Sequence, residues 1–127
     1  MAGIVVDTSA WIDFFAGKPA VALEDALAQG TAVIPPIVVA ELVSGATTTD
    51  QRHRIGELLQ DAPIHDTPLE HWVRVGDLRR MLSRKGVNVT VPDAHVAQCA
   101  LDSDAVLLAR DSVFPLIARH TALRLPA

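Results

Sequence analysis

Three short segments of this chain are apolar at nearly every position, at residues 3–6, 31–34 and 105–109. A strand with one face in water alternates apolar and polar residues, whereas a continuous apolar run is typical of a strand that is covered on both faces. Segments of helical length separate these runs, and alternating strands and helices favour a parallel sheet. The sequence therefore predicts an α/β fold: a three-layer α/β/α domain with a central parallel sheet.

Glycine and proline residues divide the rest of the chain into segments of helical length. We expect helices at residues 9–16, 19–29, 37–44, 49–60, 69–84, 92–101 and 113–119. Short strands are also expected around Ile64 and at residues 122–125. The 127 residues are enough for one sizeable core, so we expect a single domain over residues 1–127.

The composition excludes several classes of protein. No apolar run approaches the ~20 residues that span a membrane, and no secretory signal is recognisable at the N-terminus. Cys99 is the single cysteine, so a reduced, cytoplasmic protein is expected. The net charge of −4 argues against nucleic-acid binding by bulk electrostatics. Five cations lie between Arg74 and Lys85, where a solvated helix face is the default interpretation and phosphate contact the alternative.

Two aspartates follow predicted strands directly. Asp7 comes after the first strand, and Asp111 comes after the strand at residues 105–109. The carboxyl ends of parallel strands lie at one edge of a sheet, which is where sites form in this class of fold. Each aspartate, taken alone, also fits the cap of the helix that follows it.

Two further acids lie in apolar segments. Glu41 belongs to P-P-I-V-V-A-E-L-V, which predicts a helix buried on nearly every side, so its carboxylate should be paired or bind a metal. Asp93 lies at the end of an apolar stripe, which predicts that its carboxylate points to the buried side. His95, Gln98 and Asp102 are expected on the solvent side of the same helix. A capping box between Thr90 and Asp93 is the structural alternative.

Four carboxylates in one pocket would repel one another and raise their pKa values. A hard divalent cation such as Mg²⁺ or Mn²⁺ relieves this repulsion, because it prefers oxygen ligands. Such a site can activate water for attack on a phosphodiester. Thr8 and Ser9 are candidates to support a ligand carboxylate, although Ser9 also suits a helix cap. Arg110 is a candidate phosphate contact, with an ordinary surface arginine as the alternative.

Four ordered motifs carry a resemblance to a known family: V-V-D-T-S-A-W-I, V-V-A-E-L-V-S-G, P-D-A-H-V-A and L-L-A-R-D-S-V-F. Over essentially its whole length the chain resembles the PIN-domain ribonucleases, and most closely the toxins of VapBC-type (VapC-like) toxin–antitoxin pairs. The resemblance implies the strand order 3-2-1-4-5, a Mg²⁺- or Mn²⁺-dependent endoribonuclease, a homodimer and a cognate VapB-like antitoxin. By motif position it places the family's acidic quartet at Asp7, Glu41, Asp93 and Asp111.

The sequence departs from the family pattern beside the fourth acid. Ala109 and Val113 stand where the family often has polar residues. We therefore expect the metal to be held chiefly by Asp7 and Asp93, with Glu41 and Asp111 acting partly through water. The RNA that is cut, whether transfer, messenger or ribosomal, stays open.

Alternatives remain for the aromatic residues and for the function. Trp11, Phe14 and Phe15 are predicted to pack or to contact a partner rather than to stack on RNA bases. A phosphatase of the haloacid-dehalogenase type would need a second aspartate where Ser9 stands, and no nucleotide-binding loop occurs. A non-catalytic PIN-like scaffold that binds RNA or protein is the second hypothesis, and an RNA-processing nuclease without an antitoxin is the third.

Overall fold

A parallel sheet lies at the centre of the protein. The computed structural model describes residues 3–126, and its three strands are β1 (Ile4–Val6), β2 (Ala32–Val33) and β3 (Val106–Leu108). They pair in the order β2-β1-β3, and every pairing is parallel. Val5 lies opposite Val33 on one side and Leu107 on the other.

Single parallel bridges extend both edges of this sheet. Ile64 bridges Ile34 beside β2, and Arg124 bridges Val106 beside β3. The predicted strand order 3-2-1-4-5 is therefore confirmed, with each of the two outer strands reduced to one bridge. Proline explains the short edges, because Pro63, Pro68 and Pro126 lack the N–H that a longer ladder would need.

The helices lie within two residues of their expected ends. They are α1 (Thr8–Phe15), α2 (Val21–Gln29), α3 (Pro36–Gly45), α4 (Thr49–Asp61), α5 (Leu69–Arg84), α6 (Val91–Asp102) and α7 (Val113–Ala118). Gly30 ends α2 in the left-handed conformation with a φ of 71°, which glycine adopts without strain. Among the described residues, no helix is both long and apolar enough to cross a membrane.

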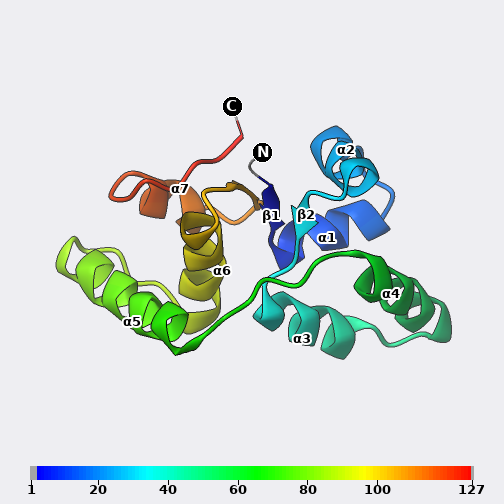
Figure 1. Cartoon of the computed structure of the whole chain (residues 1–127), viewed down its shortest axis with the longest axis horizontal. Coiled ribbons are helices and arrows are strands. Elements are labelled where there is room, and N and C mark those ends of the chain that lie inside the picture. Colours follow the sequence, from blue (N-terminus) through cyan, green and yellow to red (C-terminus); the bar gives the residue numbers. More distant parts are fainter. Residues whose placement is uncertain (1–2, 127) are drawn as a thin grey trace.

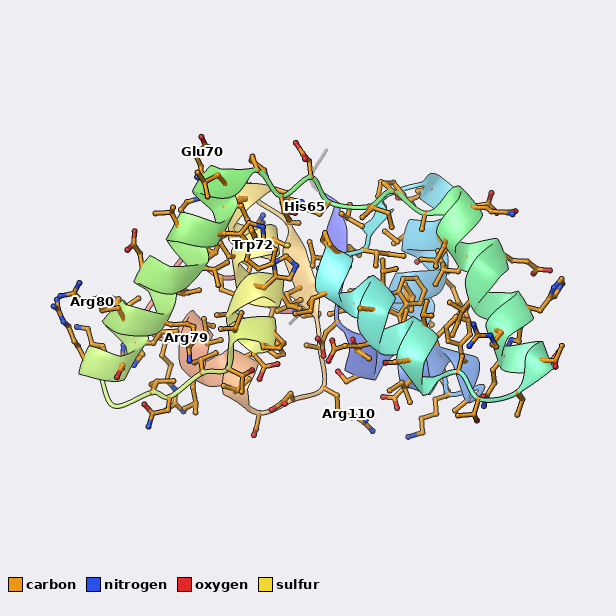
Figure 2. All side chains as sticks on the ribbon, turned by 90° about the horizontal axis from the view of Figure 1, so that it is seen from below. His65, Glu70, Trp72, Arg79, Arg80 and Arg110 are labelled. Carbon is orange, nitrogen blue, oxygen red and sulfur yellow. The ribbon has the colours of Figure 1, made fainter. Side chains whose placement is uncertain are left out.

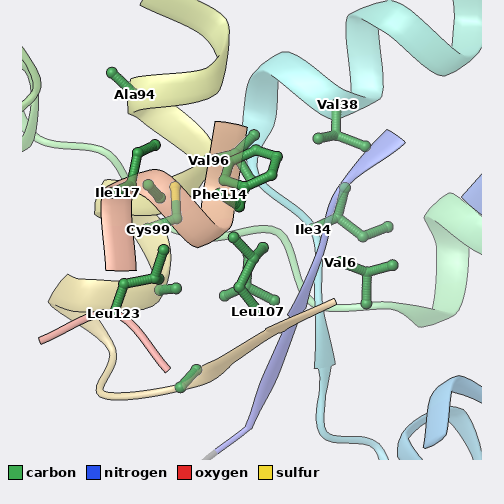
Figure 3. Close-up of a cluster of buried hydrophobic side chains, with 14 of the residues drawn as sticks. Val6, Ile34, Val38, Ala94, Val96, Cys99, Leu107, Phe114, Ile117 and Leu123 are labelled. Carbon is green, nitrogen blue, oxygen red and sulfur yellow. The ribbon is translucent and has the colours of Figure 1, made fainter. Parts of the chain in front are cut away.

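Helices cover the sheet on both sides. Figure 1 shows α5, α6 and α7 on one side of the strands and α1 to α4 on the other. Helix α6 packs on β1 and β3, and α5 lies on the outer side of α6. Val5, Val6 and Leu107 are fully buried as a result, and Figure 3 shows Leu107 on the side of α6 and α7 and Val6 beside Ile34. This double cover is why the strand sequences are continuously apolar.

Helix α3 is less buried than its sequence predicts. Only Val38 and Leu42 of this helix are buried, while Val43 is 38% exposed. Glu41 lies on the exposed side, so the prediction of a helix buried on nearly every side was wrong. The helix packs along one stripe, against α1, α4 and α6, and its remaining apolar residues are left at the surface.

Helix α6 is more buried than its sequence predicts. His95 is fully buried and Gln98 is 7% exposed, so the expectation that both face solvent was wrong. The side chain of Asp102 is only 14% exposed and points into the same contact. The reason is α5, which covers this side of α6 and supplies hydrogen-bond partners to its polar side chains.

Candidate active site

Asp7 is held rigidly at the carboxyl end of β1. It is 8% exposed and caps α1, with its Oδ2 accepting hydrogen bonds from the Ser9 amide at 3.2 Å and the Ser9 hydroxyl at 2.7 Å. Its own amide donates to the Leu108 carbonyl at 2.9 Å, which ties it to the end of β3. The sequence alternatives of cap and site residue are therefore compatible, because capping uses Oδ2 and fixes the direction of the whole carboxylate.

Ser9 links the two strand ends. While its hydroxyl donates to Asp7, its Oγ accepts from the Arg110 amide at 3.0 Å. The Arg110 guanidinium lies 3.2 Å from Asp13 Oδ1, and Figure 2 shows Arg110 extending from the edge of the molecule. The Arg110 side chain is 59% exposed, so it stays accessible at the surface.

Thr8 connects Glu41 to the same region. Its hydroxyl donates a 2.8 Å hydrogen bond to Glu41 Oε1, joining α1 to α3 across 33 positions of sequence. Glu41 is thus positioned by a neighbouring hydroxyl at the surface of the monomer. The sequence predicted that Glu41 would be buried, whereas it is exposed and the Thr8 hydrogen bond directs its side chain.

Asp93 provides the electrostatic connection among the four acids. It is half-buried in the first turn of α6, where its amide donates to the Thr90 hydroxyl at 3.2 Å. Burial raises the pKa of Asp93, a hydrogen bond with the Thr90 side chain lowers it, and the negative charges of Asp111, Asp7 and Glu41 raise it further. The four acids therefore share one electrostatic environment at the carboxyl end of the sheet.

Asp111, like Glu41, is exposed. It lies in the loop between β3 and α7, and its Oδ1 accepts from the Val113 amide at 3.1 Å. Asp111 thus bonds the first backbone amide of α7, whose N-cap position is Ser112. The carboxylates do not form a compact group with three donor atoms within 4.8 Å of one another anywhere in residues 3–126.

The donor set nevertheless fits a hard divalent cation. All four donors are carboxylates, which Mg²⁺ and Mn²⁺ prefer, and they come from separate elements that converge on Asp93. A cation would also relieve the repulsion that raises the pKa of Asp93. The assignment of individual ligands stays a prediction.

The basic cluster of α5 separates into different roles. Arg74 pairs with Asp102, and Arg79 Nε donates to the Val89 carbonyl at 2.8 Å. Figure 2 shows Arg80 pointing away from the body of the protein. Two of the five cations are thus engaged in holding α5 against its neighbours, which favours the solvated-face interpretation over a phosphate-binding patch.

Two hollows lie on either side of Phe15 and Arg54, and one of them reaches Glu41. The first, of about 370 Å³, is lined by Thr8 and Glu41 at one end and by Ile12 along α1. The second, of about 360 Å³, lies between α1, α2 and α4. Arg54 stands over the Phe15 ring at 4.9 Å and donates to the Phe15 carbonyl, which separates the two hollows.

The aromatic residues of α1 pack mainly against one another. Trp11 is fully buried and lies about 6 Å from both phenylalanine rings, at 6.0 Å from Phe14 and 6.1 Å from Phe15. Phe14 and Phe15 are half-buried and line the hollows. The prediction of packing is confirmed for Trp11, while the two phenylalanines combine packing with partial exposure.

Sequence reasoning missed a polar network in the contact between α5 and α6. His71 and His95 are both fully buried, and His71 Nε2 lies 2.8 Å from His95 Nδ1. His71 Nδ1 lies 2.8 Å from Asp102 Oδ2. Although burial raises it, hydrogen bonds from Arg74, Gln98 and His71 lower the pKa of Asp102 to about 2. One signal was available, since His95 and Cys99 are four residues apart and so share a helix face.

A parallel sheet with acids gathered at its carboxyl end defines the class of domain, and comparison with known proteins gives the family. The PIN domain family matches residues 4–120, so this chain belongs to the PIN domain family.

Solved structures agree with this fold. A chain of VapBC2 from Rickettsia felis, bound to a DNA fragment from its promoter, superposes with a TM-score of 0.78 at 23% identity over 97% of this chain and 96% of that chain. VapBC-1 from nontypeable Haemophilus influenzae gives 0.77 at 22% identity, over 97% and 96% of the two chains. DNA-bound VapBC from Salmonella typhimurium gives 0.75 at 22%, over 99% and 98%.

Proposed function

We propose that this chain is a Mg²⁺- or Mn²⁺-dependent endoribonuclease that acts as the toxin of a type II toxin–antitoxin pair. The observation that carries the nuclease proposal is the placement of Asp7, Glu41 and Asp111 close enough to Asp93 that, after burial, their charges raise its pKa. Structural acids are usually separated or paired with cations, whereas these four carboxylates are gathered where sites form in parallel sheets.

The metal ligands follow from burial and from hydrogen bonding. Asp7 and Asp93 are the proposed direct ligands, because they are the two least exposed of the four. Glu41 and Asp111 are proposed to act through water. A bound divalent cation would lower the pKa of a water molecule that it coordinates, and it would orient the phosphodiester for attack.

The protein's own groups prepare this site. Ser9 holds Asp7 in one orientation, and Thr8 does the same for Glu41. Arg110 is proposed to contact a phosphate of the substrate, since its guanidinium is exposed and its backbone amide bonds Ser9, the residue that holds Asp7. Its partner Asp13 keeps the side chain in place without burying it.

The test is cleavage of RNA. Purified protein is incubated with total cellular RNA and Mg²⁺, and the new RNA ends are mapped. Defined ends that appear with Mg²⁺ and vanish with a chelator support the proposal. Intact RNA under all metal conditions, with the protein folded, would favour the alternative of a PIN-like scaffold that binds without cutting.

The proposal of an antitoxin rests on the hollow that runs along α1 to Glu41. A peptide lying along α1 would bury Ile12 and Phe15, and it would reach Glu41 at the end of the first hollow. An arginine at that end of the peptide could pair with the carboxylates and exclude the cation. The solved structures that share this fold include VapBC2 from Rickettsia felis and a toxin–antitoxin complex from Klebsiella pneumoniae.

The toxin role has its own experiment. Expression of the protein alone should arrest growth of the host, and co-expression of the product of a small adjacent open reading frame should relieve the arrest and yield a complex. Harmless expression of folded protein with no partner recovered from its native host would favour a plain RNA-processing nuclease.

A homodimer is also proposed. Leu69, Trp72 and Val73 form an exposed apolar stripe on α5, at 76%, 39% and 55% exposure. Their spacing of three and four residues places them on one helix face. A second copy of the chain would cover such a stripe, and sedimentation of the purified protein tests it.

A further inference from the structure

The interior contact of α5 and α6 contains a group of nitrogen and sulfur donors away from the acids. His65, His71 and Cys99 each offer one donor atom, and these atoms all lie within 4.8 Å of one another. His65 comes from the loop after α4, His71 from α5 and Cys99 from α6. Within the part of the chain that the structure describes, no other group of such residues is as compact.

A fourth donor adjoins this group. His95 lies one helical turn before Cys99, with its Nδ1 2.8 Å from His71 Nε2 and its Nε2 3.8 Å from Cys99 Sγ. In a tetrahedral zinc site, bonds of about 2.3 Å to sulfur and 2.0 Å to nitrogen put neighbouring donors about 3.5 Å apart. Coordination would therefore bring Cys99 Sγ and His95 Nε2 slightly closer together and would open the 2.8 Å contact between His71 Nε2 and His95 Nδ1.

The hydrogen bonds fix which nitrogen carries a proton. Asp102 is ionised, so His71 Nδ1 donates to it and His71 Nε2 presents a lone pair. His95 Nδ1 must then donate to His71, which leaves a lone pair on His95 Nε2 facing Cys99. A carboxylate behind a histidine in this way is the arrangement that supports histidine ligands of zinc.

The surroundings also suit a metal with a preference for nitrogen and sulfur. Burial lowers the pKa of His65 and lowers that of His95 to about 4, which favours neutral imidazoles that can coordinate. Burial also raises the pKa of the Cys99 thiol, so the thiol would lose its proton only to a bound metal. Figure 3 shows Cys99 among apolar residues that include Ile117 and Leu107. Figure 2 shows Trp72 and His65 lying toward the seam between α5 and α6, and the Trp72 ring stacks on His95 at 4.6 Å.

We infer that His65, His71 and Cys99, with His95 in reach of the fourth position, form a binding site for a transition-metal ion of the zinc class. Binding forms a metal–sulfur bond at Cys99 and breaks its S–H bond, and the proton leaves to solvent. The metal cation takes the lone pair of His71 Nε2, which in its absence accepts from His95 Nδ1–H; His95 keeps this proton and turns away from His71, so that its Nε2 lone pair can face the ion. The bound ion would join the loop after α4, α5 and α6 at one point.

The probe is Co²⁺, which reports its ligands by absorption. Protein freed of metal by a chelator is titrated with Co²⁺, and a thiolate-to-cobalt charge-transfer band should grow to one ion per chain and disappear when Zn²⁺ is added. Cys99→Ser should abolish this band. Asp7→Asn should keep it, which separates this site from the acidic one.

A second readout does not depend on the cysteine variant. Zn²⁺ should raise the melting temperature, and His65→Ala should weaken the apparent affinity tenfold or more while leaving the metal-free protein folded, because His65 is only half-buried. His53→Ala, in the exposed part of α4, is the matched control and should change neither readout. Absence of the charge-transfer band, or a zinc response that His65→Ala leaves unchanged, would show that the cluster is a hydrogen-bonded seam only and overturn the inference.

Discussion

The hydroxyl of Ser9 donates a 2.7 Å hydrogen bond to Asp7 Oδ2. Ser9 Oγ also accepts a hydrogen bond from the Arg110 amide, so the Ser9 side chain ties the end of β1 to the loop after β3. This geometry leaves Asp7 Oδ1 outside these bonds. The residue that terminates the first strand is thereby both a helix cap and a fixed carboxylate at the sheet end.

Asp7→Asn should abolish cleavage without unfolding the protein. The amide retains an oxygen that can accept from Ser9, so the cap survives, whereas the negative charge that holds a cation is lost. We expect the cleavage rate to fall by more than ~100-fold, the upper end of losses seen when groups behind the ligands are removed. Asp25→Asn, on the exposed surface of α2, is the control and should cut at the normal rate. Normal cutting by Asp7→Asn, free of contaminating nuclease, would refute the assignment.

Ser9→Ala should have a smaller effect of a different kind. It removes the hydroxyl's hydrogen bonds to Asp7 and from the Arg110 amide, while the bond from the backbone amide of residue 9 to Asp7 stays. No metal ligand is lost, so cleavage should fall by roughly 10- to 100-fold and stability by about 1 kcal/mol. Ser44→Ala, which deletes a hydroxyl bonded within α3, should leave cleavage intact. Equal rates for the two variants would mean that Asp7 does not depend on Ser9.

Mn²⁺ should stabilise the folded protein through the acids. A ligand that binds only the native state at 100 times its Kd adds about 2.7 kcal/mol, which is several degrees in the melting temperature of a domain of this size. Glu41→Gln should reduce this rise, while Glu24→Gln on α2 should not. If millimolar Mn²⁺ leaves the melting temperature unchanged, the result would count against any cation site at the acids.

Acid should destabilise the protein through His95. Burial, followed by the charges of His71 and His65, lowers the pKa of His95 from 6.5 to about 4. Between these two pH values the unfolded chain binds a proton that the folded protein does not. Stability contributed by neutral His95 is therefore complete above pH 6.5 and declines as the pH falls toward 4. Asp102, with a pKa of about 2, stays ionised throughout this window.

Melting temperatures measured across this window in chelator test the sign. His95→Gln should flatten the decline, because glutamine does not titrate and can still donate to His71. His120→Gln, at an exposed position, is the control and should keep the decline of the parent protein. An unchanged slope in His95→Gln would assign the acid sensitivity to other groups.

The sequence predicted those features that depend on short stretches of chain. The apolar run of β1 and the glycine that ends α2 are local, and they located the elements within two residues. Asp7 and Asp111 each follow a strand, and parallel pairing of those strands predicted that both lie at one edge of the sheet. The burial of His95 could not be obtained in this way, because it depends on which face of α6 meets α5, a contact between residues 24 positions apart.

For Glu41 the sequence predicted too much burial, the reverse of the error made for His95. Apolar neighbours in sequence predicted burial, yet burial of a helix depends on how many elements pack around it, and α3 lies at the surface with Val43 exposed. The reason that Glu41 points to the site is a single bond from Thr8, which no periodicity could indicate. The electrostatic link to Asp93 likewise appears only once four elements are assembled.

A charge placed in the first hollow should separate nuclease activity from control by a partner. Ile12 is 53% exposed on α1 and lines the hollow that ends at Glu41. Ile12→Glu should be tolerated by the fold because the side chain already faces water, and it should cut RNA at close to the normal rate. An antitoxin segment that buries Ile12 would then have to bury an unpaired carboxylate, which costs several kcal/mol.

Cells should therefore remain arrested when Ile12→Glu is expressed together with the antitoxin, and little complex should co-purify. Val21→Glu is the matched control, since Val21 is 68% exposed on α2 and lines neither hollow. It should be neutralised as well as the parent protein is. If the antitoxin fully relieves the growth arrest caused by Ile12→Glu, and the complex is recovered normally, the partner binds another surface. The assignment of this hollow to the antitoxin would then be wrong.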